Sequence, residues 1–344
     1  MADGRTIIGL IDYQGRFSSK VHAEIPSGGM DKNQLKDAFA EQGWKLEYRM
    51  FPDQYDKLIS LRGFPVIYSS SEDVGLHYKS FIEDIIYGLE INGANVIPSH
   101  RILRAHHNKL FMEILRKTLL PSEISGITTQ YFGTIEDLQG NISAISFPCV
   151  IKGAADAGSR MVALARNQRE LLYIANKFTR SRHLCEEIRD HLRLLKHRGY
   201  RVQSLHRNKI IIQDYISGLE NDWKVLAFGR NMFVLKRANR HNDIRASGSG
   251  QFSFEHELPP GLLNYAWKVF RSLNLPHVSM DAAFDGTRFY LLEFQGVSFG
   301  TFTLENAPSY FTHSGGTWHC VKKRAVLEEE YARSIVEYIG DNRI

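Results

Sequence analysis

The chain has 344 residues, 43% of them hydrophobic and 24% charged, so it is long enough to bury two or three cores. No run approaches the roughly 18 apolar residues of a membrane span, and the N-terminus has no signal-peptide pattern. Three scattered cysteines, Cys149, Cys185 and Cys320, cannot form a disulfide framework. These features exclude a disulfide-stapled scaffold and a membrane-spanning protein, and we expect a cytoplasmic protein without a membrane partner.

The formal net charge of +5 is modest and gathers mainly in residues 180–207, which are rich in Arg, Lys and His. Such a basic segment could contact nucleic acid or another anionic surface. It lacks the interleaved aromatic residues on which single-stranded nucleic acid stacks. A solvated helical insertion is therefore the favoured interpretation, and no nucleic-acid partner is expected.

Strands and helices alternate through the first hundred residues. The predicted strands cover residues 6–12, 44–50, 64–69 and 95–97, and the predicted helices cover residues 32–42 and 77–91. This alternation is typical of a small open parallel α/β sheet. Ligands of such sheets lie beyond the carboxyl ends of the strands, so the loop 13–20 is a candidate wall of a substrate site. An ordinary surface loop explains it equally well.

The pattern changes near residue 105, and we expect three domains, covering residues 1–105, 106–209 and 210–344. The second domain begins with a predicted helix over residues 108–119 and becomes rich in strands from residue 146. The later strands are predicted at residues 147–153, 161–165, 210–216, 223–228 and 232–236. The later helices are predicted to start near residue 168 and to cover residues 257–273 and 326–339.

A lysine, Lys152, ends the apolar strand at 147–153 and is followed at once by small residues, Gly153 to Ser159. Backbone amides of such a loop can approach phosphate oxygens closely, and the lysine adds a point charge. The order differs from a Walker A motif, because the lysine precedes the glycines. Surface hairpins have a similar composition, so this pattern alone is a weak signal.

The apolar strand at 210–216 breaks at Ser217-Gly218, where free backbone groups can meet the edge of an adenine ring. Two acids follow, Glu220 and Asp222, and either can accept hydrogen bonds from ribose hydroxyls. Farther on, Arg237 ends a strand and Arg245 lies at the centre of a polar Gly/Ser loop, residues 239–250. Such a loop is disordered or ordered by a ligand, and both arginines could clamp a phosphoryl group as bidentate donors.

The segment 277–300 places an acid, Asp281, on one apolar stretch and Glu293 and Gln295 on the next. Asp285-Gly286 between them is a strong hairpin signal. Carboxylates within apolar strands are costly to bury unless something neutralises them, and oxygen ligands on adjacent strands suit Mg²⁺. An edge hairpin with three solvated polar residues is the competing interpretation.

The hairpin also sets a geometric demand. A strict two-residue Asp-Gly turn would pair Asp281 with Tyr290 and put Asp281 on the face opposite Glu293. If both acids bind metal, the loop must hold three or five residues, or a bulge must shift the register.

In order, the chain offers a lysine with a Gly loop, a hinge strand, an acid, arginines and a metal hairpin. This order resembles the ATP-grasp superfamily over residues 97–304, and most closely its branch of ribosomal-protein glutamate ligases, glutathione synthetases and D-alanine–D-alanine ligases. The resemblance implies an α/β protein whose ATP-grasp part is of the α+β type. In it a small open α/β domain precedes a two-lobed ATP-grasp, with the phosphate loop in the central lobe and the metal hairpin in the C-terminal lobe.

The resemblance also implies roles for single residues. The ATP-contacting set would be Lys109, Lys152, Gly153, Gly158, Ser159, Gln213, Asp214, Tyr215, Ile216, Glu220, Asp222, Arg245, Ala246 and Ser247, of which Asp222 or Glu220 would bind the ribose. The catalytic set would be Arg245, Lys152 and Arg237, and the metal ligands would be Asp281, Glu293 and Gln295. The chain departs from the family in carrying Gln295 where Asn is usual, and a Gln-Asp pair at the hinge.

The function that the resemblance implies is an ATP-dependent carboxylate–amine ligase that works through an acyl phosphate. Its cofactors would be ATP and two Mg²⁺ ions, with Mn²⁺ as an alternative. Its partners would be a small-molecule carboxylate and an amine, and a homodimer is the candidate assembly. A phosphotransferase with a hydroxyl acceptor and a nucleotide-binding regulator without turnover remain alternatives.

Three other groups have plain structural interpretations. The pair His106-His107 precedes a helix and fits a surface cap better than a ligand. Lys109 without the resemblance would be an ordinary exposed helix lysine. His313, His319 and Cys320 suggest zinc, but no fourth soft ligand is paired with them nearby.

Overall fold

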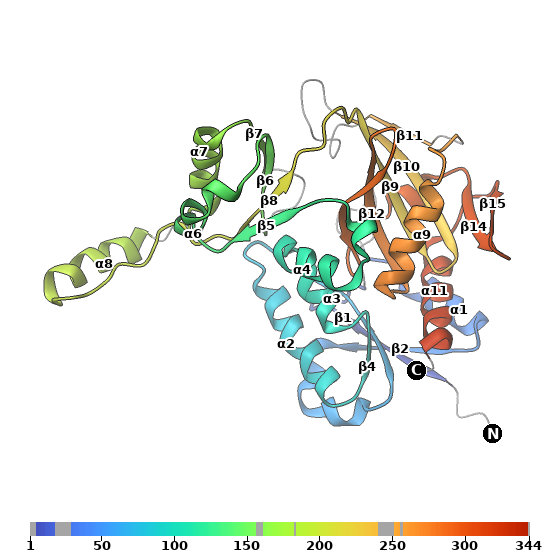
Figure 1. The fold of residues 1–344 in the computed structure, drawn as a ribbon. Coiled ribbons are helices and arrows are strands. Elements are labelled where there is room, and N and C mark those ends of the chain that lie inside the picture. Colours follow the sequence, from blue (N-terminus) through green and yellow to red (C-terminus); the bar gives the residue numbers. More distant parts are fainter. Residues whose placement is uncertain are drawn as a thin grey trace.

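The computed structural model describes residues 5–17, 29–155, 161–181, 184–239, 251–254 and 257–342. These residues form three sheets with helices packed against them (Figure 1). The predicted α/β class is confirmed. No helix of the described residues has both the length and the apolar character needed to cross a membrane.

The N-terminal sheet is parallel and has four strands. They are β1 (Thr6–Ile11), β2 (Lys45–Met50), β3 (Pro65–Tyr68) and β4 (Asn95–Ile97), in the spatial order β2-β1-β3-β4. Helices α1 (Lys32–Glu41) and α2 (His77–Ile91) and the 3₁₀ helix η1 (Phe51–Leu61) connect them. The expected alternation is confirmed, and η1 is the element that it did not include.

The middle sheet is antiparallel, with strands β5 (Thr129–Phe132), β6 (Cys149–Gly153), β7 (Val162–Ala165) and β8 (Ile210–Asp214) in the order β5-β8-β6-β7. Helices α6 (Ile135–Gly140) and α7 (Gln168–Thr179) cover its core, and a short 3₁₀ helix, η2 (Ile142–Ala144), follows α6. The three-domain division stays a prediction. A boundary at residue 210 would cut this sheet, because β8 pairs with both β5 and β6.

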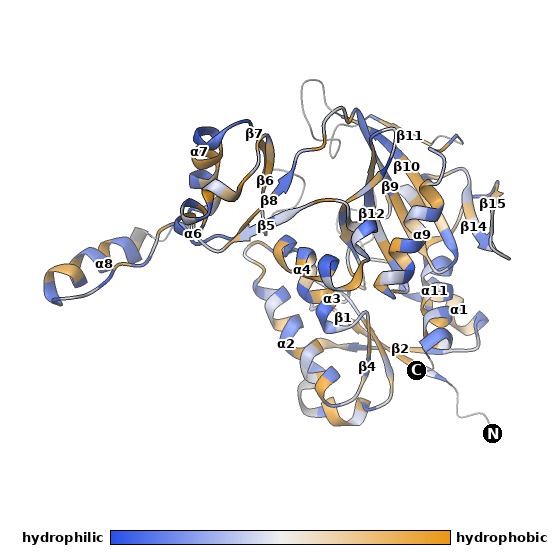
Figure 2. Ribbon diagram, in the orientation of Figure 1, coloured by the Kyte–Doolittle hydropathy of each residue, from blue (hydrophilic) through white to orange (hydrophobic). Residues whose placement is uncertain are grey.

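Helix α8 (Leu184–Lys196) projects away from the middle sheet and mixes hydrophilic and hydrophobic residues along its length (Figure 2). Ile188, Leu192 and Leu195 on it are exposed. The described part of the basic segment 180–207 thus carries an exposed helix, in agreement with the predicted helical insertion.

The largest sheet has the order β13-β12-β9-β10-β14-β15, with β11 beside β10. Its strands are β9 (Asn221–Phe228), β10 (Asn231–Ala238), β11 (Phe252–Ser253), β12 (His277–Phe284), β13 (Phe289–Gln295), β14 (Tyr310–Ser314) and β15 (Thr317–Val321), and its helices are α9 (Leu262–Leu273), α10 (Phe302–Asn306) and α11 (Leu327–Asn342). The helix predicted from residue 257 begins only at Leu262, after Pro259-Pro260. Proline fits at a helix start and not within its hydrogen-bond ladder.

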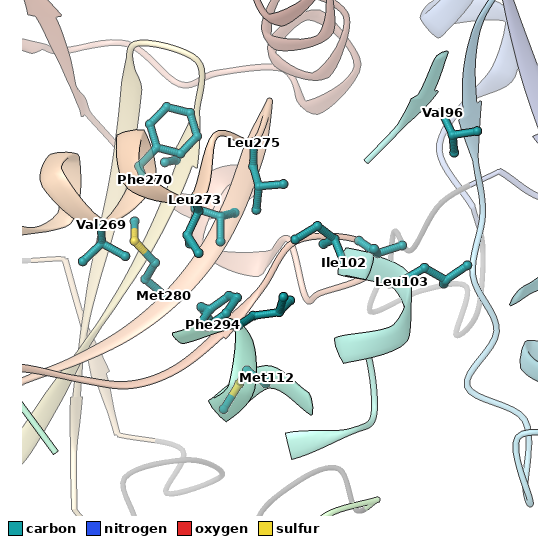
Figure 3. Packing of buried hydrophobic residues seen from close by; sticks show 14 of the residues in the cluster. Val96, Ile102, Leu103, Met112, Val269, Phe270, Leu273, Leu275, Met280 and Phe294 are labelled. Atoms are coloured by element: carbon teal, nitrogen blue, oxygen red, sulfur yellow. The ribbon is translucent and has the colours of Figure 1, made fainter. Parts of the chain in front are cut away.

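Two helices link the N-terminal sheet to the large sheet. They are α3 (His100–Ala105) and α4 (Lys109–Leu119), and the one-turn helix α5 (Ser122–Ser125) follows them. Ile102 and Met112 on α3 and α4 belong to one core with Phe270, Met280 and Phe294 of the large sheet and its helix (Figure 3). Packing on both sides therefore fixes the start of α4, where Lys109 stands.

His277, at the start of β12, is a buried histidine whose burial can be tested by measuring how stability depends on pH. His277 stacks on Phe228 with ring centroids 5.5 Å apart and lies 4.9 Å from the Tyr331 ring. Burial lowers its pKa to about 3, so the folded chain keeps this ring neutral while the unfolded chain protonates it near pH 6.5. Stability is then lost as the pH falls from about 6.5 toward 3, by about 1.4 kcal/mol per pH unit for this one proton.

We expect His277→Phe to remove that part of the slope. Urea unfolding at pH 7, 6 and 5 measures it, with the exposed His197→Gln as the matched control. An unchanged slope in His277→Phe would contradict the assignment.

Candidate active site

The hairpin β12–β13 places its two acids side by side. Asp281 lies directly opposite Glu293 in the antiparallel ladder, and the register shifts by a bulge next to Asp281. The loop between the paired residues Phe284 and Phe289 covers residues 285–288, so a two-residue turn centred on Asp285-Gly286 does not form. Directly opposite residues project from the same face of a sheet. A four-residue loop keeps the parity of a two-residue turn, so the geometric condition for a shared metal is met by the bulge alone.

An arginine from another part of the chain supports the bulge. Arg116 on α4 donates hydrogen bonds to the carbonyl oxygens of Leu291 and Leu292, the latter at 3.2 Å. A bulge interrupts the hydrogen-bond ladder, and Arg116 provides partners for carbonyls at this interruption. The position of Glu293 relative to Asp281 therefore depends on α4.

Arg116 is itself held by a buried acid. Glu113 lies one turn earlier on α4, with its Oε1 3.1 Å from Arg116 Nη2, and both side chains are 1% exposed. Glu113 also accepts hydrogen bonds from Thr129 of β5 at 2.8 Å and from Gln213 of β8 at 3.1 Å. One network of hydrogen bonds thus joins the hinge strand β8 to the metal hairpin.

Cationic side chains neutralise Asp281 in this structure. Arg237 Nη2 lies 2.8 Å from Asp281 Oδ2, and Lys224 Nζ lies 3.6 Å from Asp281 Oδ1. Burial alone would raise the pKa of Asp281, but the charges of Arg237 and Lys224 outweigh it and hold the pKa at about 2. Asp281 is therefore an ionised carboxylate throughout the physiological pH range.

The donor set fits a hard divalent cation. Asp281 Oδ1 is buried and has no hydrogen-bond partner among the described residues, and Glu293 opposite it is partly exposed. Gln295 lies on the same face, but its amide N–H donates a hydrogen bond to Glu293 Oε1, with an N···O distance of 3.1 Å. Ligation through the Gln295 oxygen requires a rotation of its amide. Two carboxylates and an amide oxygen are ligands that Mg²⁺ accepts.

Two lysines from different elements face this hairpin. Lys109 opens α4, and its Nζ lies 3.9 Å from Glu293 Oε1. Its backbone N–H donates to Ala154 at 2.8 Å, which ties the start of α4 to the end of the strand that carries Lys152. Burial lowers the pKa of Lys152, and the charges of Glu293 and Glu113 partly offset the effect. The acids of the large sheet thus meet the lysines of α4 and the middle sheet.

The hinge strand ends two residues before the predicted end at residue 216. β8 ends at the exposed Asp214, and Tyr215 and Ile216 follow outside the ladder. Gln213 is buried and its side chain is used by Glu113 and Thr129. Its backbone lies within the sheet, opposite Thr129 of β5 and Val150 of β6.

The structure separates the two acids proposed for the ribose. Asp222 is buried and forms a bidentate ion pair with Arg237, at 2.6 and 2.8 Å, on the same sheet face as Asp281 and Lys224. Glu220 is exposed beyond the end of β8. The Asp222 carboxylate is therefore engaged by Arg237, whereas the Glu220 side chain is exposed.

The residues predicted for the Gly loop and the arginine loop are only partly covered by the structure. Gly153 ends β6, where a Cβ would lie 2.8 Å from the Met161 side chain. Gly158, Ser159, Arg245, Ala246 and Ser247 lie outside the described residues.

His313 and His319 are on opposite faces of the β14–β15 hairpin, because His319 follows the residue that pairs with His313. That zinc suggestion therefore lacks converging ligands.

Sequence reasoning missed Glu113, Arg116 and Lys224. The one available signal for the first two is their spacing of three residues on the apolar face of α4, next to Met112 and Leu115. Charged residues on such a face are almost never buried unless they are paired. Lys224 gave no comparable signal.

No protein-family model matches the chain, and no curated protein matches its sequence. Solved structures are similar to it. D-cycloserine synthetase DcsG has a TM-score of 0.56 at 12% identity, over 96% of this chain and 99% of that one. The D-alanine–D-alanine ligase of Bacillus anthracis complexed with ATP has a TM-score of 0.52 at 15% identity, over 98% of each chain. A RimK domain ATP-grasp protein from Sphaerobacter thermophilus DSM 20745 has a TM-score of 0.50 at 13% identity, over 96% of this chain and 98% of that one.

The chain therefore has the ATP-grasp fold, and the likeness extends over nearly its whole length. The matched structures carry the names of synthetases and ligases, and the predicted resemblance to the ATP-grasp superfamily is confirmed for the fold.

Proposed function

We propose that the protein is an ATP-dependent ligase that joins a small-molecule carboxylate to an amine. The observation that carries the proposal is the pairing of Asp281 with Glu293 across a bulge, on a face that also meets Lys109. A decorated edge hairpin would need neither the bulge nor lysine-bearing elements from elsewhere in the chain. Fixed positive charge beside paired carboxylates suits phosphoryl transfer, which depends on positioning and charge neutralisation.

The proposed reaction has two steps. A carboxylate oxygen of the substrate attacks the γ-phosphorus, the bond to the β–γ bridging oxygen breaks, and ADP leaves with that electron pair. The amine then attacks the acyl carbon, the bond from that carbon to the phosphate oxygen breaks, phosphate leaves, and the attacking nitrogen gives up one proton to the released phosphate or to solvent. The names of D-alanine–D-alanine ligase and D-cycloserine synthetase among the similar structures support this choice over a hydroxyl acceptor.

The chain's own residues have distinct tasks in this scheme. Lys109 and Lys152 would bind phosphate oxygens of ATP, and Asp281, Glu293 and Gln295 would hold the metal. Bound Mg²⁺, or Mn²⁺, would supply neutralising charge for the β- and γ-phosphates. Arg237 is pinned by Asp222 and already oriented toward Asp281, so it would stabilise developing negative charge without first reorganising. The hinge 213–216 would present backbone groups to adenine, with Glu220 at the ribose.

The residues of the Gly loop and of the arginine loop complete the proposal. Gly158 and Ser159 would cover the phosphates, Arg245 would clamp the γ-phosphate, and Ala246 and Ser247 would add backbone contacts.

A substrate screen tests the proposal. The protein is incubated with Mg-ATP and pooled carboxylates, with and without pooled amines, and ADP release is measured together with the mass of condensation products. A ligase releases ADP only when both substrates are present, and hydroxylamine in place of the amine traps the acyl phosphate as a hydroxamate. ATP consumption with an alcohol alone would identify a phosphotransferase instead. Nucleotide binding without turnover under every condition would identify a regulator.

A further inference from the structure

Glu72, His106 and His107 converge at the junction between the N-terminal sheet and α4. Glu72 lies in the loop after β3, and the two histidines lie between α3 and α4. Glu72 Oε1 is 3.5 Å from His106 Nε2 and 3.5 Å from His107 Nε2. Among the described residues, this is the one group of three or more His, Cys, Asp or Glu whose ligand atoms all lie within 4.8 Å of one another.

The expected surface position of the histidine pair is wrong. The side chain of His106 is 3% exposed and that of His107 is 12% exposed. The helix cap is instead Asn108, whose side chain accepts a hydrogen bond from the backbone N–H of Phe111. Buried imidazoles need partners for their nitrogens, so the cluster calls for an explanation other than capping.

The hydrogen bonds of the cluster are incomplete. His107 Nε2 is buried and has no hydrogen-bond partner in the part of the chain that the structure describes. The separations of 3.5 Å from Glu72 exceed the roughly 2.7–3.2 Å of a good N–H···O hydrogen bond. They match the edge of a coordination tetrahedron, which is roughly 3.4 Å for metal–ligand bonds of about 2.1 Å.

The surroundings of His106 agree with ligation. Its Nδ1 lies 2.9 Å from Ser70 Oγ, and metal-bound histidines typically have such a partner on the nitrogen that does not touch the metal. His107 has a φ of 52°, a left-handed conformation that non-glycine residues rarely adopt and that is enriched at functional sites.

We propose that Glu72, His106 and His107 form a binding site for Zn²⁺, separate from the magnesium ligands of the β12–β13 hairpin. Two imidazoles and one carboxylate favour zinc over Mg²⁺, which prefers oxygen ligands. Three protein ligands leave a fourth position for water or for an oxygen or nitrogen atom of a substrate.

Because of where the site lies in the fold, zinc bound there would connect two parts of the molecule. His107 is two residues before Lys109, and Asn108 between them also accepts from Lys209 Nζ at 3.2 Å. A metal that links Glu72 to His107 therefore joins the N-terminal sheet to the start of α4. Zinc is expected to order this junction even when no nucleotide is present.

Calorimetric titration of the full chain with ZnCl₂ tests the proposal, after treatment with a chelator and without nucleotide. We expect one equivalent of zinc to bind to the wild type. Glu72→Gln and His107→Gln are expected to weaken binding by at least tenfold, and Ser70→Ala by about tenfold, the usual effect of losing an outer-shell partner. His100→Gln on the neighbouring helix, an imidazole outside the cluster, is the matched control and should bind like the wild type.

Co²⁺ in place of Zn²⁺ gives a second readout. The absorption spectrum should show four-coordinate nitrogen and oxygen ligands, without the charge-transfer bands of a cysteine thiolate. Stoichiometric binding that is unchanged in both Glu72→Gln and His107→Gln would overturn the assignment, as would a thiolate spectrum or no binding at all. Because ATP is absent, none of these outcomes depends on the proposed ligase activity.

Discussion

Replacing Asp281 with Asn, or Glu293 with Gln, is expected to lower Mg²⁺-dependent ATP turnover at least 100-fold, a loss typical of removing one preorganised electrostatic contact. Each change keeps the size of the side chain and removes one charge from the paired carboxylates. ADP release at increasing Mg²⁺ concentration is the measurement. The concentration needed for half-maximal rate should rise, because the variants bind the cation more weakly.

Glu305→Gln is the matched control for these variants. Glu305 is an acid of α10 that accepts a hydrogen bond from Thr301 at 2.6 Å and lies outside the site, so its turnover should be that of the wild type. Unfolding curves separate loss of the site from loss of the fold, since Asp281→Asn also takes a partner from Arg237. An Asp281→Asn/Glu293→Gln double variant that retained turnover would refute the site.

Arg116→Met is expected to lower the free energy of unfolding by about 3–5 kcal/mol, the usual cost of removing one partner from a buried ion pair. Glu113 would lose its ion-pair partner at a site where its side chain is 1% exposed. The carbonyls of Leu291 and Leu292 would also lose their arginine partner. Urea unfolding at pH 7 measures the loss.

A double-mutant cycle assigns that cost to the pair. In Glu113→Gln/Arg116→Met no ionised side chain is left unpaired, so the double variant should be more stable than Arg116→Met alone. Additive losses would show that the two residues act independently. Because Arg116 supports the bulge, we also expect Arg116→Met to reduce turnover at temperatures where it is still folded, whereas Thr118→Ala on the exposed side of α4 should not.

The acids of the hairpin can be recognised from the local sequence, whereas the role of Arg116 depends on contacts between distant residues. The acids of the hairpin stood out in the sequence, because carboxylates within apolar strands are rare and the Asp-Gly turn fixed their approximate separation. Helix α2 and strand β4 were likewise predicted over their observed ranges, because local periodicity and turn residues determine such elements. The order Lys152, hinge, arginines and acids is a property of the chain itself, and it was enough to indicate the ATP-grasp fold.

Other assignments required contacts between distant residues. Asp222 and Glu220 looked equivalent as ribose acids until the pairing of β9 with β10 placed Arg237 beside Asp222. Strand β5 and the β14–β15 hairpin carry weak local patterns and are held by strand pairs that no short window of sequence contains.

Residue type and local spacing depend only on neighbours along the chain, and they were enough to select the candidate nucleotide and metal residues and their order. The tertiary structure alone decided that Asp281 and Glu293 share a face. A one-residue shift in strand register reverses the face of every side chain, and that shift is supported by Arg116, which is 175 residues from Leu291 along the chain. It also decided that His106 and His107 meet Glu72, since burial and convergence arise only when separate elements pack together.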